Sequence, residues 1–104
     1  VEFDFSYSVT RNNPDLVASL IPSLERVVGP DMVAETAPIM GAEDFAYFAE
    51  RVPAMYLFLG ARPPEIPLAE AAWNHSPRFM VDEDVIETGM RLMAGLALDY
   101  LNRE

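Results

Sequence analysis

The sequence predicts an α/β fold, in which helices pack against a β-sheet. Three observations carry this prediction. Apolar and polar residues alternate over residues 1–10, an unbroken apolar run covers residues 54–59, and apolar residues recur at helical spacing over residues 14–28 and 82–102. The predicted order is strand, helix, short strand, short helix, strand, long loop and helix. With 104 residues, the chain can form one small domain or part of a larger one.

The first ten residues have the strict alternation of a strand with one buried face. Val1, Phe3, Phe5, Tyr7 and Val9 are separated by polar residues. A lone strand leaves its backbone and its apolar face unsatisfied, so it must pair with a sheet elsewhere. The sequence also starts inside this pattern and without a methionine. We therefore expect the chain to be part of a longer protein.

The first predicted helix covers residues 14–28. Asn13 can accept a hydrogen bond at its start, Pro14 suits the first helical position, and Gly29 is a typical residue at a helix end. A short strand is predicted over residues 32–34. The expected buried face of the helix consists of Leu16, Leu20, Ile21, Leu24, Val27 and Val28.

A shorter helix is predicted over residues 43–51, with Phe45 and Phe48 buried. The apolar run 54–59 lies between a proline and a glycine, which favours a strand buried on both faces. A proline-rich loop over residues 61–72 leads towards the final helix, which is predicted from about residue 82 to residue 102. Its expected buried face consists of Val85, Ile86, Met90, Met93, Leu96, Ala97 and Tyr100.

Composition excludes several classes of function. The net charge is −10, and all seven basic residues are arginines, so neither the cationic face that nucleic acids require nor a lysine-rich membrane-binding segment is present. The chain has no cysteine, which rules out a disulfide framework, a thiolate nucleophile and a cysteine zinc site within it. No Gly-x-Ser-x-Gly motif provides a serine nucleophile.

Two segments near the final helix could take part in chemistry. His75, the one histidine, could act as a general base or as a metal ligand, or it could be an ordinary surface or capping residue. The acidic run 82–84 could orient an imidazole or bind a cation, or it could serve as the first turn of the helix. One imidazole does not make a catalytic zinc site, which needs three protein ligands, so these motifs alone assign no reaction.

The segment 40–45 is the third candidate. A glycine loop that enters a helix presents free backbone N–H groups, which suit an anion such as a substrate carboxylate. The alternative is that Glu43 and Asp44 satisfy those same donors themselves.

Taken together, several ordered motifs resemble a family of metallopeptidases. They are the segment 41–48, the pair Val52-Pro53, the run that ends at Gly60, and the segment 75–79 followed by residues 81–83. The resemblance is to the C-terminal part of hippurate hydrolase, the indoleacetyl-amino-acid hydrolases and related amidohydrolases and carboxypeptidases. It implies that residues 11–104 are the C-terminal segment of a two- or three-layer α/β catalytic domain. Residues 1–10 would be the last strand of a smaller α+β lid or dimerisation domain.

The resemblance implies a fragment of a hydrolase that cleaves the amide bond of N-acyl amino acids or small peptides with metal-activated water. His75 would be a ligand of a site for two divalent ions (zinc, manganese or cobalt), and the loop with Gly41, Glu43 and Asp44 would lie at the substrate pocket. In such enzymes the general base and the other ligands come from the N-terminal part. We therefore expect no catalytic residue in this chain and no activity from the chain alone.

The implied partners are an N-acyl amino acid or peptide substrate, the missing N-terminal part of the protein, and a second copy in a homodimer. Nucleic acid and membrane are not expected as partners, and the expected location is the cytoplasm of a bacterium. The alternative function is that of a non-catalytic acidic binding or regulatory module with the same fold.

Overall fold

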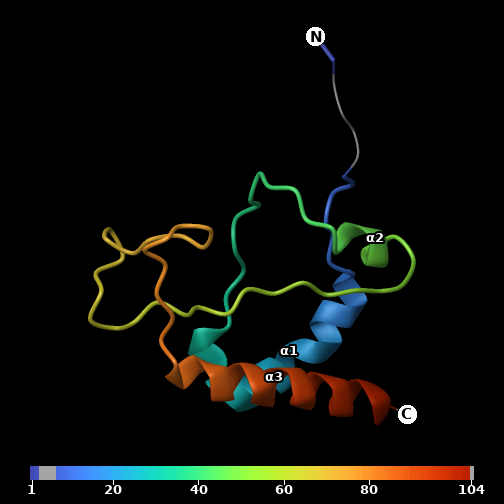
Figure 1. Cartoon of the computed structure of the whole chain (residues 1–104). Helices are drawn as coiled ribbons and strands as arrows, with labels where there is room; N and C mark the ends of the chain where they lie inside the picture. Colours follow the sequence, from blue (N-terminus) through green and yellow to red (C-terminus); the bar gives the residue numbers. More distant parts are fainter. Residues whose placement is uncertain (3–6, 104) are drawn as a thin grey trace. The chain divides into compact units, whose positions relative to one another are not determined.

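The computed structural model describes residues 1, 2 and 7–103 (Figure 1). Within these residues it contains the α-helices α1 (Pro14–Val28), α2 (Ala46–Ala49) and α3 (Asp84–Leu101), and the 3-10 helix η1 (Pro30–Met32). Contacts along the chain define two compact units. The first unit comprises Val1–Leu57 and the second Phe58–Glu104.

The prediction of an α/β fold is wrong for the described part of the chain, because no β-strand forms there. The predicted strand 1–10 falls partly on residues 3–6, which lie outside the described residues, and residues 7–10 have no regular structure. Met32, from the predicted short strand, belongs to η1. The apolar run 54–59 is likewise not a strand.

The hydrogen bonds of the run 54–59 explain this difference. The carbonyl of Ala54 accepts from the N–H of Asn13 at 2.9 Å. The N–H of Tyr56 donates to Asn12 Oδ1 at 2.7 Å, and the carbonyl of Tyr56 accepts from Asn12 Nδ2 at 2.9 Å. One side-chain amide therefore satisfies both backbone groups of Tyr56, as a neighbouring strand would. An apolar run indicates that a segment could be buried, but it does not provide the second strand.

The neighbouring residues Asn12 and Asn13 allow a matched test of this pairing. Asn12→Asp removes the donor to the Tyr56 carbonyl and places a carboxylate against it, so we expect a loss of about 1 kcal/mol in the free energy of unfolding. Asn13→Asp keeps a good helix cap, so we expect a change below about 0.5 kcal/mol. Urea unfolding of the two variants measures both values. Equal losses would contradict the role assigned to Asn12.

Helix α1 has the boundaries that the sequence predicts. Asn13 Oδ1 accepts from the N–H of Leu16 at 2.9 Å, and Pro14 occupies the first turn. At the other end Gly29 has φ 90°, and its N–H donates to the carbonyl of Glu25 at 2.7 Å. That positive φ favours glycine, because a Cβ would strain the backbone there. Leu20 is buried and the other predicted apolar residues of α1 are half-buried, which confirms the predicted face.

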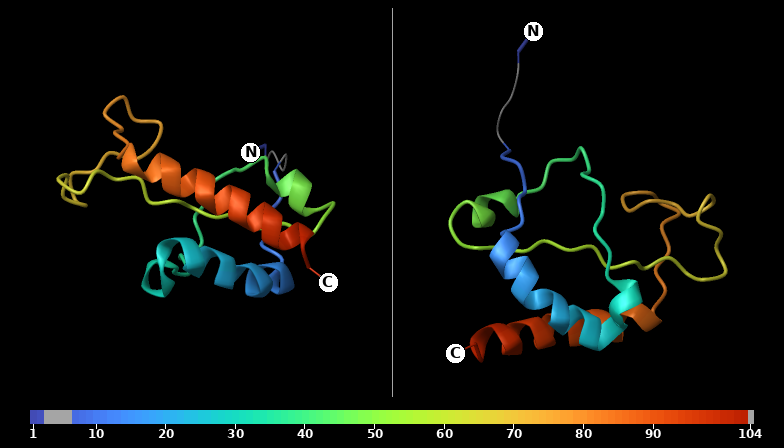
Figure 2. Two further views of the ribbon diagram at one scale, coloured as in Figure 1. Left: turned by 90° about the horizontal axis from the view of Figure 1, so that it is seen from below. Right: turned by 180° about the vertical axis from the view of Figure 1, so that it is seen from behind.

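Helix α2 is shorter than predicted, with a single turn over Ala46–Ala49 flanked by hydrogen-bonded turns. Ala46 is fully buried and Phe45 half-buried, but Phe48 is exposed, so its predicted burial is wrong. The rings of Tyr7 and Tyr47 lie 5.9 Å apart, and those of Phe45 and Tyr56 lie 5.3 Å apart. These contacts hold α2 beside the segment that leads into α1 (Figures 1 and 2).

In the second unit a long loop precedes α3 and folds back on itself (yellow to orange in Figure 2). The guanidinium of Arg62 donates to the carbonyls of Pro63 and Ile66, which holds the beginning of the loop in a turn. At the other end the N–H of Asp82 donates to the carbonyl of Ala61 at 2.9 Å. Residues 61 and 82 thus close the loop at its base, and this loop contains His75.

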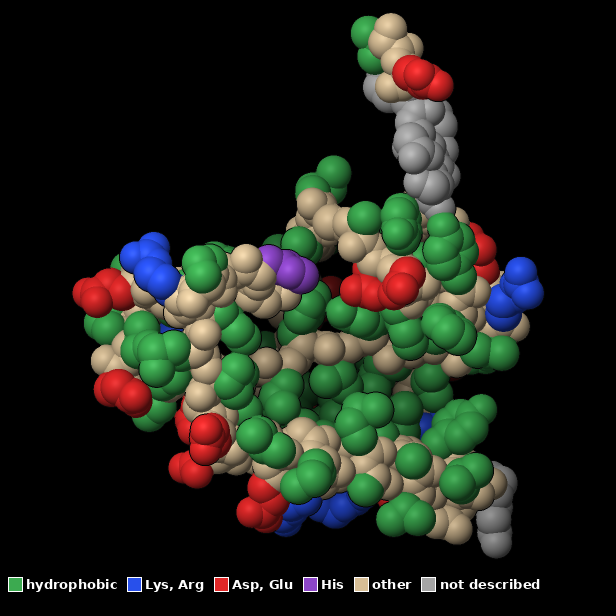
Figure 3. Space-filling model, in the orientation of Figure 1, with side chains coloured by type: hydrophobic (Ala, Val, Ile, Leu, Met, Phe, Trp, Pro, Cys, Tyr) green, Lys and Arg blue, Asp and Glu red, His purple; other side chains and the backbone are tan. Residues whose placement is uncertain are grey.

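The predicted buried face of helix α3 is confirmed only in part. Leu96 is buried, as predicted, and Val85 is half-buried, but Met90 and Met93 are 62% and 64% exposed, and the buried Leu92 lies outside the predicted face. Figure 3 shows apolar side chains exposed along this helix. Apolar residues occur on more than one side of α3, so their spacing alone could not decide which side is covered. No helix in the described part of the chain is long and apolar enough to cross a membrane.

Within the second unit, α3 packs closely against the end of the apolar run. A Cβ atom placed on Gly89 would lie 3.1 Å from the Cδ2 atom of Leu59. The absence of a side chain at Gly89 therefore allows Leu59 to approach the helix.

Candidate functional site

His75 lies in a tight turn formed by residues 73–76. The N–H of Ser76 donates to the carbonyl of Trp73 at 3.2 Å, so His75 is the third residue of the turn. Its φ is 69°, and no other non-glycine residue in the described ranges has a positive φ. A type II turn needs a positive φ at this third position, where glycine or asparagine is the usual residue. A positive φ is uncommon for any residue other than glycine, although asparagine and histidine adopt it more readily than most.

A second turn follows directly and points the chain towards α3. The N–H of Phe79 donates to the carbonyl of Ser76 at 3.0 Å, and the N–H of Arg78 donates to the Ser76 hydroxyl oxygen at 3.2 Å. Pro77 is the second residue of this turn, where its fixed φ is favourable. The Ser-Pro pair thus fixes the backbone on the C-terminal side of His75. The imidazole is exposed.

The acidic run 82–84 serves the start of α3. Asp82 Oδ1 accepts from the N–H of Asp84 at 3.0 Å, and the carbonyl of Asp82 accepts from Val85. Of the two alternatives in the sequence, this geometry matches the helix N-terminal cluster. Among the described residues no group of three or more His, Asp or Glu side chains could hold a metal ion. Within the described part of the chain His75 is thus a potential single ligand.

The candidate substrate loop belongs to the first unit, whereas His75 belongs to the second. At its tip the N–H of Gly41 donates to the carbonyl of Ile39 at 3.0 Å, and Met40 is fully exposed. A Cβ atom on Gly41 would have no neighbour within 4 Å, so nothing in the described structure requires glycine there. Asp44 is also exposed.

Glu43, in contrast, is engaged with its own chain. Its Oε1 atom accepts from the N–H of Phe45 at 3.1 Å, and its Oε2 atom accepts from the Tyr56 hydroxyl at 3.0 Å. The Phe45 N–H and then the Tyr56 hydroxyl lower the pKa of the Glu43 carboxyl, and the hydrogen bond to Glu43 raises the pKa of Tyr56. Because the folded-state pKa of Glu43 is depressed, its stabilising effect is present above pH 4.5 and is lost as the pH falls through the lowered value.

The short length of α2 makes its N-terminus a weak binding site for an anion. A four-residue helix aligns few peptide dipoles, so its N-terminus has little of the positive potential that a long helix provides. The roles of Gly41, Glu43 and Asp44 in substrate binding therefore stay a prediction.

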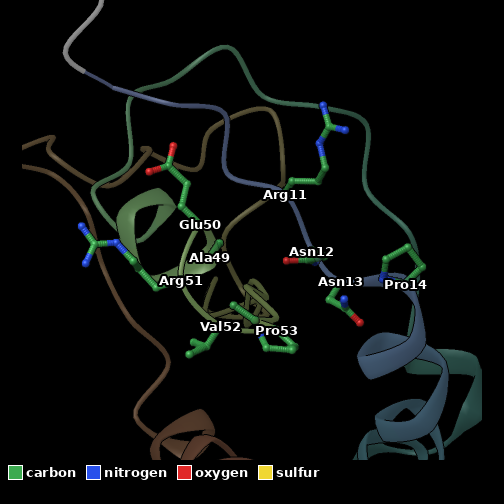
Figure 4. Close-up of a pocket in the computed structure, with 10 residues that line it drawn as sticks. Arg11, Asn12, Asn13, Pro14, Ala49, Glu50, Arg51, Val52 and Pro53 are labelled. Atoms are coloured by element: carbon green, nitrogen blue, oxygen red, sulfur yellow. The ribbon is translucent and has the colours of Figure 1, made fainter.

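The first unit also contains an open pocket of about 340 Å³ between residues 11–14 and 49–54. Arg11 and Arg51 lie on opposite sides of it and their guanidinium groups point away from each other (Figure 4). The hydrogen bond from Asn13 to Ala54 joins the two segments that line it. The two guanidinium groups are therefore not arranged to hold one anion between them.

Sequence reasoning did not identify Asn12 and Tyr56, whose contacts hold the loop and the run 54–59 together. The pair Asn12-Asn13 before a proline indicated a helix cap, but it gave no sign that the first asparagine would pair with a residue 44 positions away. Tyr56 stood within an apolar run, and only its hydroxyl distinguished it from its neighbours.

Comparison with known proteins identifies the class of protein. Residues 1–99 match the description "Peptidase family M20/M25/M40". The chain is 38% identical over 97 residues to thermostable carboxypeptidase 2 of Saccharolobus solfataricus, and 35% identical over 95 residues to IAA-amino acid hydrolase ILR1-like 2 of Arabidopsis thaliana. It is 29% identical over 98 residues to the putative amidohydrolase YhaA of Bacillus subtilis. No solved structure matches the chain.

These matches cover most of this chain and a small part of each relative. They include 93%, 91% and 94% of the chain but only 23%, 21% and 24% of the three relatives. The chain therefore spans about a quarter or less of the length of the proteins that it matches. The class is that of the metal-dependent amidohydrolases and carboxypeptidases, as the resemblance implied. The chain belongs to peptidase family M20/M25/M40.

Proposed function

We propose that the full-length protein cleaves the amide bond of N-acyl amino acids or small peptides with metal-activated water, and that His75 is one of its metal ligands. The match of residues 1–99 to a peptidase family carries this proposal. Two of the similar proteins are named as a carboxypeptidase and an amino-acid conjugate hydrolase, and both names describe hydrolysis of an amide bond next to an amino acid.

The geometry of His75 supports its role as a ligand. Residues held at unfavourable backbone angles concentrate at functional sites, where a particular side chain is needed despite its cost. His75 has such an angle, with φ 69°, and its imidazole is accessible. The two consecutive turns around it limit the directions that the ring can take. Asparagine or glycine would suit the backbone better, but neither has an imidazole.

Among the described residues, the side chains fit a metal ion as the source of one ligand, His75. An exposed imidazole is a good ligand for zinc and other divalent transition-metal ions, but a catalytic ion needs several protein ligands. We propose a site for two such ions, whose other ligands come from elsewhere in the full-length protein. When bound, such ions polarise the substrate carbonyl and make water a better nucleophile. We propose that His75 contributes its imidazole to this site from a fixed position on the loop 61–82.

The exposed residues of the loop 39–45 fit a role in substrate binding. Gly41 has open space where a Cβ would be, and a bare backbone allows a ligand to come close. The neighbouring Asp44 is exposed. We propose that this loop forms part of the wall of the substrate pocket.

Metal removal from the full-length protein tests the proposed reaction. The protein is assayed with benzoyl-glycine, an indoleacetyl amino acid and a dipeptide, before and after treatment with a chelator. We expect hydrolysis of at least one substrate, its loss after chelation, and recovery when zinc, manganese or cobalt is added back. Hydrolysis that continues unchanged without metal would contradict the proposal. Binding of these compounds without hydrolysis would favour the alternative, an acidic binding module, which agrees with the net charge of −10.

A further inference from the structure

The carboxylate of Glu43 is held by two donors of its own chain, one on each oxygen. Phe45 donates its backbone N–H to Oε1 at 3.1 Å, and Tyr56 donates its hydroxyl to Oε2 at 3.0 Å. Hydrogen bonds to a charged acceptor are among the stronger ones in proteins. The side chain of Glu43 is therefore turned towards the first unit itself.

Tyr56 is well placed to fix Glu43, because its backbone N–H, its backbone carbonyl and its ring each contact another residue of the first unit. Its backbone N–H and carbonyl both pair with the side chain of Asn12, at 2.7 and 2.9 Å. Its ring contacts that of Phe45, with centroids 5.3 Å apart and planes at 52°. The phenol oxygen thus has a position set from the segment before α1, far from Glu43 in the sequence.

Glu43 connects the Tyr56 hydroxyl to the candidate substrate loop. It lies between the tip at Gly41 and the single turn of α2, which begins at Ala46. The tip has a hydrogen bond of its own, from Gly41 to Ile39. A fixed Glu43 therefore sets the direction in which the tip projects, and Gly41 and Asp44 on either side of Glu43 are exposed.

We propose that Tyr56 is a positioning residue, whose hydroxyl holds Glu43 against the N–H of Phe45 and so directs Gly41 and Asp44 towards the substrate. This inference rests on the proposed function, because it assumes that the loop 39–45 meets the substrate. It gives Glu43 a different task from its two neighbours. Glu43 acts through the backbone of the loop, while Gly41 and Asp44 face the ligand.

Ultraviolet titration of the tyrosines tests the Tyr56–Glu43 contact without any enzyme assay. The chain has four tyrosines, and the carboxylate of Glu43 raises the pKa of Tyr56 above 10.0. We expect one tyrosine of the wild-type chain to ionise late. Tyr56→Phe should remove this late step, and Glu43→Gln should move it to lower pH. If Glu43→Gln leaves the titration unchanged, the contact is absent and the inference is wrong.

Steady-state kinetics of the full-length protein tests the positioning role. Tyr56→Phe should raise KM about tenfold, the effect of one hydrogen bond to a charged group, while kcat stays within about twofold. Tyr100→Phe, on the half-exposed surface of α3, is the matched control and should change neither value. Glu43→Gln retains an acceptor for the N–H of Phe45, so it should raise KM less than Glu43→Ala.

Failure of the positioning role and failure of the proposed function would give different experimental results. A normal KM in Tyr56→Phe, with the late tyrosine step removed, would show that the contact exists but does not position the loop, which overturns the inference alone. Full-length wild-type protein that neither binds nor cleaves N-acyl amino acids would overturn the proposed function, and the positioning role with it, whatever the titration shows.

Discussion

His75→Ala is expected to abolish amide hydrolysis by the full-length protein and to remove bound metal at the same time. Changes to residues that merely orient a metal ligand cost about 10–100-fold in affinity or activity, so loss of a ligand should lower kcat/KM by at least about 100-fold. The relevant measurements are kcat/KM for an N-acyl amino acid and the metal content of the same preparation. Loss of activity with full metal content would assign His75 another role.

His75→Asn is the matched control for the shape of the turn. Asparagine adopts a positive φ readily, so the turn 73–76 should keep its form while the imidazole is lost. We expect the same loss of activity and metal as in His75→Ala, with the free energy of unfolding unchanged or slightly raised. If His75→Asn kept its activity, the turn rather than the imidazole would be the functional feature.

Leu92→Ala is expected to cause the largest loss of stability. Leu92 is 5% exposed in α3, and removal of a buried leucine side chain costs about 2–5 kcal/mol. Leu98, in the same helix, is 60% exposed, so Leu98→Ala should change the free energy of unfolding by less than about 0.5 kcal/mol. Urea unfolding followed by circular dichroism measures both.

A comparison of Leu92 with Met93 decides which face of α3 is covered. The spacing of apolar residues predicted burial of Leu96, Met90 and Met93. The structure buries Leu96 but exposes both methionines, and it buries Leu92 in their place. A larger loss for Met93→Ala than for Leu92→Ala would favour the face predicted from the sequence and contradict the structure.

Local signals explain why α1 could be predicted from the sequence. Asn13, Pro14 and Gly29 act on backbone groups within four residues of themselves, so their effect can be read without knowledge of the fold. The start of α3 at the acidic run 82–84 also follows from groups that are neighbours in the sequence.

The predicted strands do not form, because strand pairing depends on residues that are distant in the sequence. An apolar or alternating segment forms a strand only when another strand pairs with it, and no pattern within residues 54–59 states what the partner is. In the structure the partner of Tyr56 is the side chain of Asn12, 44 residues away. The contact between Glu43 and Tyr56 joins residues 13 positions apart, and it too depends on the tertiary fold. The sequence thus indicated the loop and His75 but not the groups that hold the loop.

Metal analysis of the full-length protein, as wild type and as His75→Ala prepared in parallel, tests the central claim most directly. We expect divalent metal bound to the wild type and its loss from the variant, together with loss of hydrolysis. Equal metal content and equal hydrolysis in the two proteins would contradict the assignment of His75 as a metal ligand.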